Sequence, residues 1–174
     1  MIIRISDLPG DGVTIDDPAS LGSPFEDPSW RLGRVRLRVA RDGADVVVDG
    51  LVEATVPLVC SRCLEAFAAE ARAPIDLRFV PRPAMADTIE LSGDDLETDF
   101  YADDQLDLAA LVRTETTLAL PMKPLCQPGC RGLCPACGAN RNLTPCACAD
   151  RPRDPRLAGL RDAVGAPRTP KGRG

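Results

Sequence analysis

The sequence predicts an α+β protein in which one main helix covers a twisted antiparallel sheet and an all-cysteine zinc module follows near the C-terminal end. Three observations predict this architecture. Apolar and polar residues alternate in several segments between residues 34 and 79, which is typical of half-buried strands. A segment after residue 107 has apolar residues at helical spacing. Most of the cysteines are crowded between residues 126 and 148.

The first two strands are predicted on either side of a tight turn. Residues 34–39 alternate arginines with apolar side chains, and we place the arginines on the solvated face of the strand. A nucleic-acid surface is the weaker alternative there, because no aromatic residues are interleaved for base stacking. Asp42-Gly43 is a turn signal, and residues 45–52 form the second strand with a break or bulge at Gly50.

The first cysteine pair, Cys60 and Cys63, is predicted to lie at a reversal between two further strand segments. Residues 55–59 run directly into Cys60, and residues 73–79 are the clearest part of the strand that follows. At such a reversal both thiols can turn toward one metal ion while the flanking strands pair. Three other segments complete this part of the chain: loops at residues 7–30 and 81–87, and a short strand at residues 88–91.

The main helix is predicted to start after Asp107, which serves as its N-cap, and to end at Pro121. Glu115 lies at the edge of its apolar face. That face should cover the sheet and comprises Leu108, Leu111, Val112, Leu118 and Ala119. The acidic segment 94–104 precedes the helix, and Phe100 and Tyr101 are expected to pack inward from it. We expect a solvated loop, because the spacing of its carboxylates is not that of a calcium-binding loop.

The chain divides into three predicted parts: a sheet-plus-helix body over residues 1–121, a cysteine-rich zinc module over residues 122–161, and a disordered basic tail over residues 162–174. The charge is divided unevenly. Residues 1–122 carry 11 basic and 23 acidic side chains, a net charge of −12, whereas residues 123–174 carry 10 basic and 3 acidic ones, a net charge of +7. The long-range field of the body does not attract nucleic acid, but the basic end could do so, unless its arginines serve only solubility.

The eight cysteines are predicted to bind structural zinc. Zinc prefers four tetrahedral ligands and is well matched by thiolates, and the sequence contains no histidine to share the task. Four cysteine pairs therefore favour two zinc ions, each held by four cysteines. The pairs can combine in three ways. Spacing favours one local set, Cys134, Cys137, Cys146 and Cys148, and one set that staples the module to the strand reversal, Cys60, Cys63, Cys126 and Cys130.

Four rival interpretations of the cysteines stay open. Disulfides need an oxidising compartment, of which the sequence gives no sign. An iron–sulfur cluster also uses four thiolates, but the turn Cys134-Pro135-Ala136-Cys137-Gly138 is more typical of zinc. A redox pair at Cys60 and Cys63 would be expected in a βαβ context rather than between two strands. A single zinc ion with some cysteines left free is the strongest competitor.

Several function classes are disfavoured by the sequence. A zinc ion closed by four thiolates has no open position for water or substrate. No Gly-rich phosphate loop or nucleophile elbow is found, so we expect neither an enzyme nor a small-molecule substrate. No apolar segment approaches the ~20 residues that span a bilayer, and no targeting signal is recognised. We therefore expect a cytoplasmic protein without a membrane partner.

The motifs of this chain resemble those of the YceD family of bacterial and plastid proteins. The segment Val59-Cys60-Ser61-Arg62-Cys63-Leu64-Glu65, followed by Phe67, is similar to its central motif. The segment 118–121, followed by Pro124-Leu125-Cys126, is similar to its second block. Residues 130–140 and Asp154-Pro155-Arg156-Leu157 resemble the cysteine-rich end of many members. One departure is Arg141-Asn142-Leu143, where the family more often has Leu-Asn directly after the residue that corresponds to Asn140.

The resemblance implies a non-enzymatic factor needed for the accumulation of large-subunit (23S) ribosomal RNA. On this interpretation the partner is ribosomal RNA or an assembling large ribosomal subunit. The candidates for phosphate contacts are basic residues of the C-terminal part: Arg131, Arg141, Arg151, Arg153, Arg156 and Arg161. Two alternatives stay open. The acidic body could dock on a basic partner such as a ribosomal protein, as a zinc-stabilised adaptor, or the cysteines could serve a thiol redox sensor.

Overall fold

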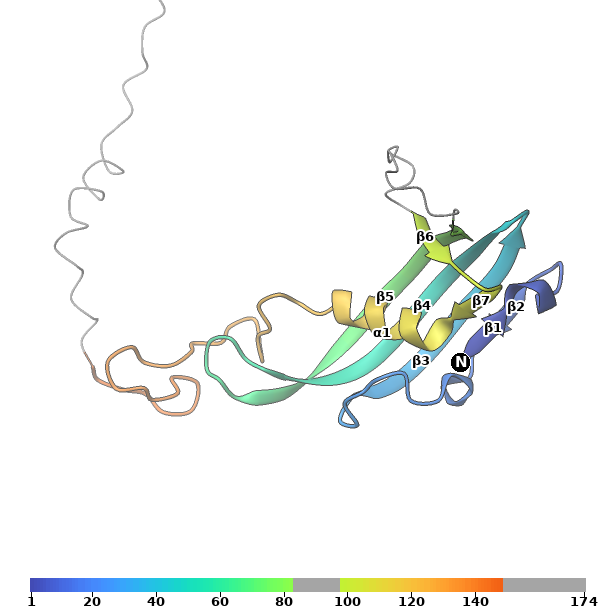
Figure 1. The fold of residues 1–174 in the computed structure, drawn as a ribbon. Helices are drawn as coiled ribbons and strands as arrows, with labels where there is room; N and C mark the ends of the chain where they lie inside the picture. Colours follow the sequence, from blue (N-terminus) through green and yellow to red (C-terminus); the bar gives the residue numbers. More distant parts are fainter. Residues whose placement is uncertain (83–97, 149–174) are drawn as a thin grey trace, which may run out of the picture.

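The computed structural model describes residues 1–82 and 98–148, and these form seven strands, one α-helix and two 3-10 turns (Figure 1). The predicted strand 88–91, the first part of the acidic segment 94–104 and the tail 162–174 lie outside the described residues. The strands are β1 (Ile2–Arg4), β2 (Val13–Ile15), β3 (Arg31–Asp42), β4 (Asp45–Val59), β5 (Ala66–Pro81), β6 (Thr98–Tyr101) and β7 (Gln105–Asp107). The helix is α1 (Leu108–Leu118), and the 3-10 turns are η1 (Ile5–Asp7) and η2 (Pro18–Leu21).

The main sheet has five strands in the order β2-β3-β4-β5-β6. Its first three pairings are antiparallel, as predicted, but β5 and β6 pair in parallel. The expectation of a purely antiparallel sheet was therefore wrong at this edge. Parallel neighbours cannot be joined by a short hairpin, and this pair is separated in sequence by residues 82–97.

The three long strands follow the predicted alternation. On β3, Val35, Leu37 and Val39 are fully buried, and the arginines between them are exposed. The same face of β4 and β5 contributes further valines and Ile75 to a single core. Burying these side chains stabilises the fold by about 1.5–3 kcal/mol each relative to exposure. The result is one layer of sheet with an apolar face that needs a cover.

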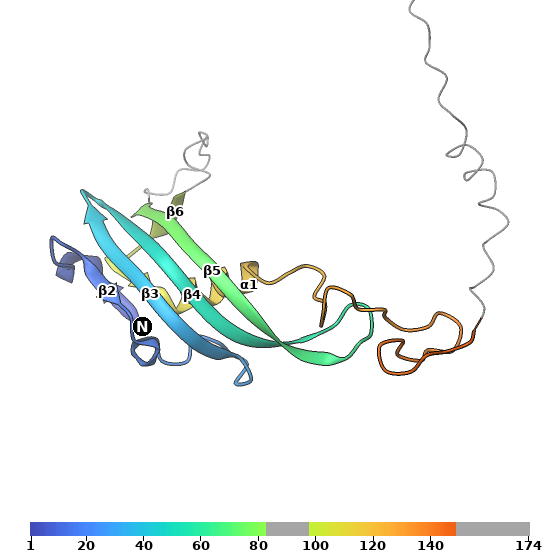
Figure 2. The same cartoon turned by 180° about the vertical axis from the view of Figure 1, so that it is seen from behind.

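Helix α1 provides this cover, and Figures 1 and 2 show it lying across one face of the sheet while the other face stays open. Asp107 is its N-cap as predicted, since its carboxylate accepts hydrogen bonds from the amides of Ala109 and Ala110 at 3.0 and 3.2 Å. Leu108, Leu111 and Val112 are buried against the sheet. Leu118, predicted on the same face, is 71% exposed because the helix ends there.

The N-terminal segment is more ordered than predicted. Residues 7–30 were expected to be loop with at most short extended pieces; β2, which pairs with β3, is one such piece, and the turn η2 was not predicted. Strand β1 pairs antiparallel with β7, with Ile2 opposite Asp107, and so brings the start of the chain to the start of α1. Strands of three residues carry too little periodicity to be recognised from sequence.

Gly50 lies on β4 where the backbone of β3 leaves no room for a side chain. It was expected to break or bulge the second strand, yet β4 continues through it with Gly50 opposite Leu37. Its φ is +147°, and a Cβ atom placed there would overlap the backbone carbonyl of Arg36. Only glycine allows the two backbones this approach.

Phe100 and Tyr101 differ in their packing. Tyr101 packs against the core, as predicted, and its hydroxyl donates a hydrogen bond to the carbonyl of Ala44 at 2.7 Å. Phe100 was expected to pack inward, but its side chain is 43% exposed on the edge strand β6. Neighbouring residues of a strand point to opposite sides of the sheet, so both rings cannot share the core.

The hairpin of β4 and β5 extends beyond the region that α1 covers (Figures 1 and 2). Their pairing is continuous from Val46 opposite Phe79 to Val59 opposite Ala66. At this far end the hairpin meets residues 122–148, the described part of the cysteine-rich segment, which contain no helix or strand and are seen beside the hairpin tip in both views. Among residues 1–82 and 98–148, no helix is long and apolar enough to cross a bilayer.

Gly50→Ala is expected to destabilise the protein by about 2–4 kcal/mol, because the added methyl group forces β3 and β4 apart. Urea denaturation of the metal-loaded protein measures the change. Gly10→Ala is the matched control, since a Cβ atom there meets nothing within 4 Å. Equal denaturation midpoints for the two variants would contradict this account of Gly50.

Candidate metal centre

The tip of the β4–β5 hairpin folds into a compact turn around Cys60 and Cys63. The amide of Cys60 donates to the carbonyl of Glu65 at 2.9 Å, and the amide of Leu64 donates to the carbonyl of Cys60 at 3.0 Å. These two bonds close the turn and leave both sulfurs on its inner side, where the residues are 0% and 3% exposed. The prediction that this CxxC lies between two strands is confirmed.

A second turn with the same hydrogen bonds lies at Cys134. The amide of Cys134 donates to the carbonyl of Ala139, and the amide of Gly138 donates to the carbonyl of Cys134, both at 2.8 Å. The residue after the second cysteine has a positive φ in both turns, +74° at Gly138 and +61° at Leu64. Leucine is strained in this left-handed region. The first turn therefore has the geometry of the second without its glycine.

The cysteine-rich segment is fastened to the hairpin tip by backbone and side-chain hydrogen bonds. The amide of Ser61 donates to the carbonyl of Pro124 at 2.8 Å, and the amide of Leu133 donates to the carbonyl of Arg62 at 3.0 Å. The guanidinium of Arg62 donates to the carbonyl of Cys130, also at 3.0 Å. The tip is thus held from both sides, which brings distant cysteines next to Cys60 and Cys63.

The first group of four sulfurs has dimensions that suit a tetrahedral ion. Cys60, Cys63, Cys126 and Cys130 place their sulfurs within 4.8 Å of one another. Two separations are 3.7 Å, from Cys60 to Cys130, and 3.6 Å, from Cys63 to Cys126. Four sulfurs at ~2.3 Å from a central zinc lie ~3.8 Å apart, whereas a disulfide requires ~2.05 Å. All eight cysteines are free thiols.

The second group joins Cys134, Cys137, Cys146 and Cys148, again within 4.8 Å of one another. The structure therefore brings the cysteines together in the two groups that sequence spacing favoured. The groups differ in exposure. Three of the four residues in the first group are buried, and they pack with Phe67 and Leu125 in a small separate core. In the second group, Cys137 and Cys148 are exposed.

The pKa values of the thiols in each group favour binding of a cation. Hydrogen bonds from backbone N–H groups, chiefly that of Cys63, lower the pKa of Cys60 to about 6. In the second group the backbone N–H of Cys137 is the main cause that lowers the pKa of Cys134 to about 6. Burial raises the pKa of Cys126 to about 12, and neighbouring Cys137 raises that of Cys148 to about 12. Without metal, four thiolates so close together repel one another. A divalent ion removes this repulsion and displaces the remaining protons.

Asn142 is a supporting residue that sequence reasoning missed. Its amide nitrogen donates to the sulfur of Cys130 at 3.3 Å and to the side-chain oxygen of Asn140, while its oxygen accepts from the amide of Arg131 at 2.8 Å. The bond to sulfur is the main cause that lowers the pKa of Cys130. Asn142 lies between Cys137 and Cys146 in sequence, so it links the loop of the second group to the first. The only signal was its place in the segment that departs from the YceD pattern.

Only two of the six candidate RNA-contact arginines fall within the described residues. Arg131 and Arg141 are exposed and, with Pro145 and Cys146, line a concave site of about 440 Å³. Their guanidinium groups have no ion-pair or hydrogen-bond partner among residues 1–82 and 98–148. Arg151, Arg153, Arg156 and Arg161 lie outside the described part of the chain. The structure thus brings two of the candidates to one surface beside the second cysteine group.

Comparison with known proteins identifies a family. The model of the family described as "Large ribosomal RNA subunit accumulation protein YceD" matches residues 48–162, which is more than half of the chain. This range begins within β4 and includes all eight cysteines. No solved structure is significantly similar.

Relatives among curated proteins agree with the family match. An uncharacterized protein of Mycobacterium tuberculosis is 33% identical over 103 residues, which cover 59% of this chain and 48% of the relative. The maize protein named "Large ribosomal RNA subunit accumulation protein YCED homolog 1, chloroplastic" is 27% identical over 179 residues, covering 87% and 57%. Its Arabidopsis thaliana namesake is 25% identical over 144 residues, covering 70% and 45%. The chain spans about half the length of the curated relatives it matches.

Titration of the reduced, metal-free protein with Co²⁺ is expected to saturate at two equivalents, because each group offers four sulfurs at bonding distance. The thiolate-to-cobalt charge-transfer absorbance measures binding. Cys60→Ser with Cys63→Ser, or Cys137→Ser with Cys148→Ser, should each remove one equivalent and leave the other. Binding should weaken as the pH falls, because protons compete for the thiolates.

Saturation at one equivalent in the unmodified protein would contradict the two-site geometry. Ser61→Ala serves as the control within the first turn, since only the backbone amide of Ser61 takes part in a hydrogen bond there. This variant should still bind two equivalents.

Proposed function

This chain belongs to the YceD family, and we propose that it is a non-enzymatic, zinc-binding factor needed for the accumulation of 23S ribosomal RNA in large-subunit biogenesis. The observation that carries the proposal is the family match over residues 48–162, which includes both cysteine groups. The plant relatives carry the same description in their names. That description is of an accumulation factor and not of a catalyst.

Zinc fits the two groups better than its rivals do. Sulfur separations of 3.6–3.7 Å match a tetrahedral site. A site closed by four thiolates offers no coordination position for water, so the metal's role is to hold the structure together. Structural zinc contributes about 10–16 kcal/mol to folding, and closing a long loop costs only a few kcal/mol. We propose two zinc ions, one per group.

Ribosomal RNA is the proposed partner of the basic C-terminal part. The surface beside the second cysteine group presents Arg131 and Arg141 around one concavity, with no carboxylate partner for either among the described residues. Guanidinium groups of this kind bind phosphate oxygens. Arg151, Arg153, Arg156 and Arg161 extend the same basic composition and are proposed to contribute phosphate contacts as well.

A protein-protein adaptor is the second candidate function, and the charge of the body favours it. Residues 1–122 carry a net charge of −12, which suits a basic partner such as a ribosomal protein. A thiol redox sensor has weaker support, although the exposure of Cys137 and Cys148 is compatible with it. We propose that the protein acts in the cytoplasm. The plant relatives, by contrast, are named as chloroplastic.

Cells that lack this gene are expected to show a lower ratio of large-subunit to small-subunit ribosomal RNA. The ratio is measured on total RNA during steady growth. Complementation with the unmodified gene or with Ser61→Ala should restore it, whereas Cys60→Ser with Cys63→Ser should not, because the module then loses its attachment to the hairpin. An unchanged ratio in the deletion strain would overturn the proposed function.

Replacing Arg131 and Arg141 together by Gln is expected to weaken binding to 23S ribosomal RNA. Each lost phosphate contact should lower the magnitude of the slope of log K against log[salt] by about 0.7–0.9, so the pair lowers it by about 1.5. Filter binding over a series of salt concentrations measures the slope. Arg34→Gln with Arg36→Gln on the open sheet face is the charge-matched control. An unchanged slope would rule out these two arginines as phosphate contacts. If the association with ribosomal particles survives nuclease treatment, the adaptor function is favoured.

A further inference from the structure

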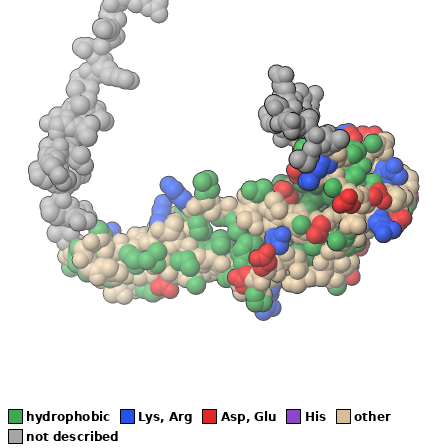
Figure 3. All heavy atoms as spheres, in the orientation of Figure 1, with side chains coloured by type: hydrophobic (Ala, Val, Ile, Leu, Met, Phe, Trp, Pro, Cys, Tyr) green, Lys and Arg blue, Asp and Glu red, His purple; other side chains and the backbone are tan. Residues whose placement is uncertain are grey.

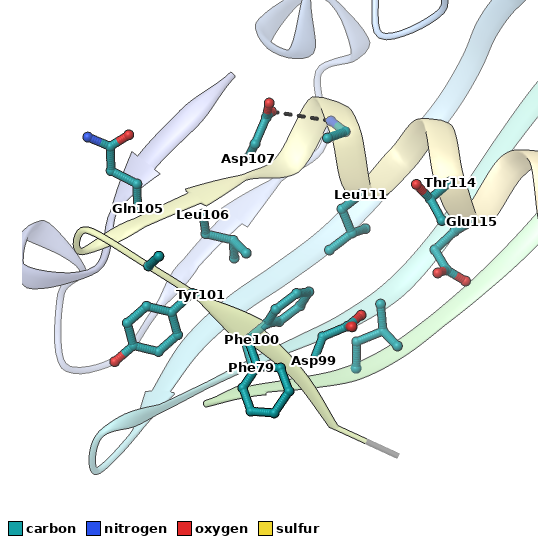
Figure 4. Close-up of a pocket in the computed structure, with 13 residues that line it drawn as sticks. Phe79, Asp99, Phe100, Tyr101, Gln105, Leu106, Asp107, Leu111, Thr114 and Glu115 are labelled. Atoms are coloured by element: carbon teal, nitrogen blue, oxygen red, sulfur yellow. Dashed lines mark hydrogen bonds between the residues drawn. The ribbon is translucent and has the colours of Figure 1, made fainter. Parts of the chain in front are cut away.

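A pocket of about 310 Å³, with no cysteine in its lining, lies between α1 and the edge of the sheet (Figure 4). Its walls come from the end of β5, from β6 and β7, and from residues Ala110 to Glu115 of α1. This volume is at the small end of ligand pockets, which run from ~300 to ~1,000 Å³. It therefore suits a single side chain better than a nucleotide.

The pocket has an apolar floor and aromatic walls. Leu77 and Leu111 contribute aliphatic surface. Phe79 and Tyr101 lie on the same side of the sheet as Asp99, and Phe100 lines the rim from the position between Asp99 and Tyr101 on β6. Phe100 is 43% exposed even though it is a large aromatic residue. Tyr101 lies on the same side of β6 as Asp99, so its ring belongs to the same wall as that carboxylate, and aromatic rings attract cations.

Two carboxylates face the same space. Figure 4 shows the side chain of Glu115, from α1, and that of Asp99, from β6, directed into the gap between the helix and the strand. Neither has an ion-pair or hydrogen-bond partner among residues 1–82 and 98–148. The connection between β5 and β6, residues 82–97, contains one basic residue, Arg82, and no ion pair joins it to either carboxylate. Burial and the charge of Asp99 both raise the pKa of Glu115, as expected for a carboxylate without a counter-ion.

We propose that this pocket receives an arginine side chain of a basic protein partner. The planar guanidinium can bind both carboxylates while its alkyl stem lies against Leu77 and Leu111. The surrounding field favours this ligand, since residues 1–122 carry a net charge of −12, and Figure 3 shows acidic side chains interspersed with basic ones over the visible face of the body.

Other ligands fit the pocket less well. A phosphate-bearing ligand such as RNA is repelled by Asp99 and Glu115. A divalent metal ion needs about six oxygen ligands, and much of the wall here is carbon. A neutral apolar ligand would bury two carboxylates without compensation. The inference concerns a protein partner and does not rest on the proposed binding of RNA.

The test is an NMR titration of the full-length, zinc-loaded protein with N-acetyl-arginine methylamide, using the citrulline analogue as a neutral probe of the same shape. The arginine probe should give saturable shifts at the methyl groups of Leu77 and Leu111 and at the ring of Phe100. The citrulline probe should bind at least ~5-fold more weakly, since a close ion pair near a surface is worth up to ~1 kcal/mol.

Asp99→Asn with Glu115→Gln should weaken binding of the arginine probe by at least ~5-fold, because the ion pairs with the guanidinium are lost. The variant should still fold, because the substitutions remove two carboxylates that repel each other. Asp16→Asn with Asp76→Asn is the control with the same change in charge, and its binding should be unchanged. Three outcomes would overturn the proposal: equal binding of both probes, equal binding by the pocket variant, or no saturable shift at all.

Two further outcomes would assign the pocket to another occupant and also overturn the proposal. Equivalent shifts on addition of Mg²⁺ would identify a metal site. Shifts of resonances from residues 150–174 in the pocket variant without any probe would identify the basic end of this chain as the ligand. A negative result at the pocket leaves the ribosomal RNA ratio and the salt slope unaffected, so the two proposals fail separately.

Discussion

The placement of residues 122–148 depends on one constraint, the meeting of Cys60 and Cys63 with Cys126 and Cys130. Residues 122–148 contain no strand or helix and bury few apolar side chains, so they cannot form an independent hydrophobic core. Four sulfurs within 4.8 Å, together with the hydrogen bonds of Arg62, fix this segment on the hairpin tip. Asn142, in the loop of the second group, donates a hydrogen bond to the sulfur of Cys130 and so connects that loop to the first group. Order in the module therefore spreads outward from the tip.

The strength of the local signal decides how much of this was predictable from sequence. Alternation in residues 34–39 and helical spacing after Asp107 predicted β3 and α1, since one face of each is fully buried. The cysteine groups followed from spacing and from the absence of histidine. The three-residue strands, the parallel pairing of β6 and the exposure of Phe100 did not follow, because they depend on contacts between residues far apart in sequence. Asn142 was missed for the same reason: its role rests on the sulfur of Cys130.

Charge is separated along the molecule in a way that matches its two proposed surfaces. The body keeps its carboxylates where apolar packing ends, as at Asp99 and Glu115, and most of its arginines on the open sheet face. The module presents Arg131 and Arg141 beside the second cysteine group. An acidic surface and a basic surface at opposite ends of one hairpin suit a protein that contacts two different classes of macromolecule at once. The rigid β4–β5 ladder sets the distance between them.

The separation of Cys60 from Cys130 along the chain has a consequence for synthesis. The two are 70 residues apart, and translation adds about 5–20 residues per second, so the first pair waits roughly 4–14 s for its partners. During that interval the hairpin can form, but its tip has only half of a coordination shell. A longer delay applies at the other end, where Ile2 of β1 waits for Asp107, 105 residues later, or roughly 5–21 s. In the nascent chain, the β1–β7 pairing and the first cysteine group thus form late and at similar times, after β3, β4 and β5 have been synthesised.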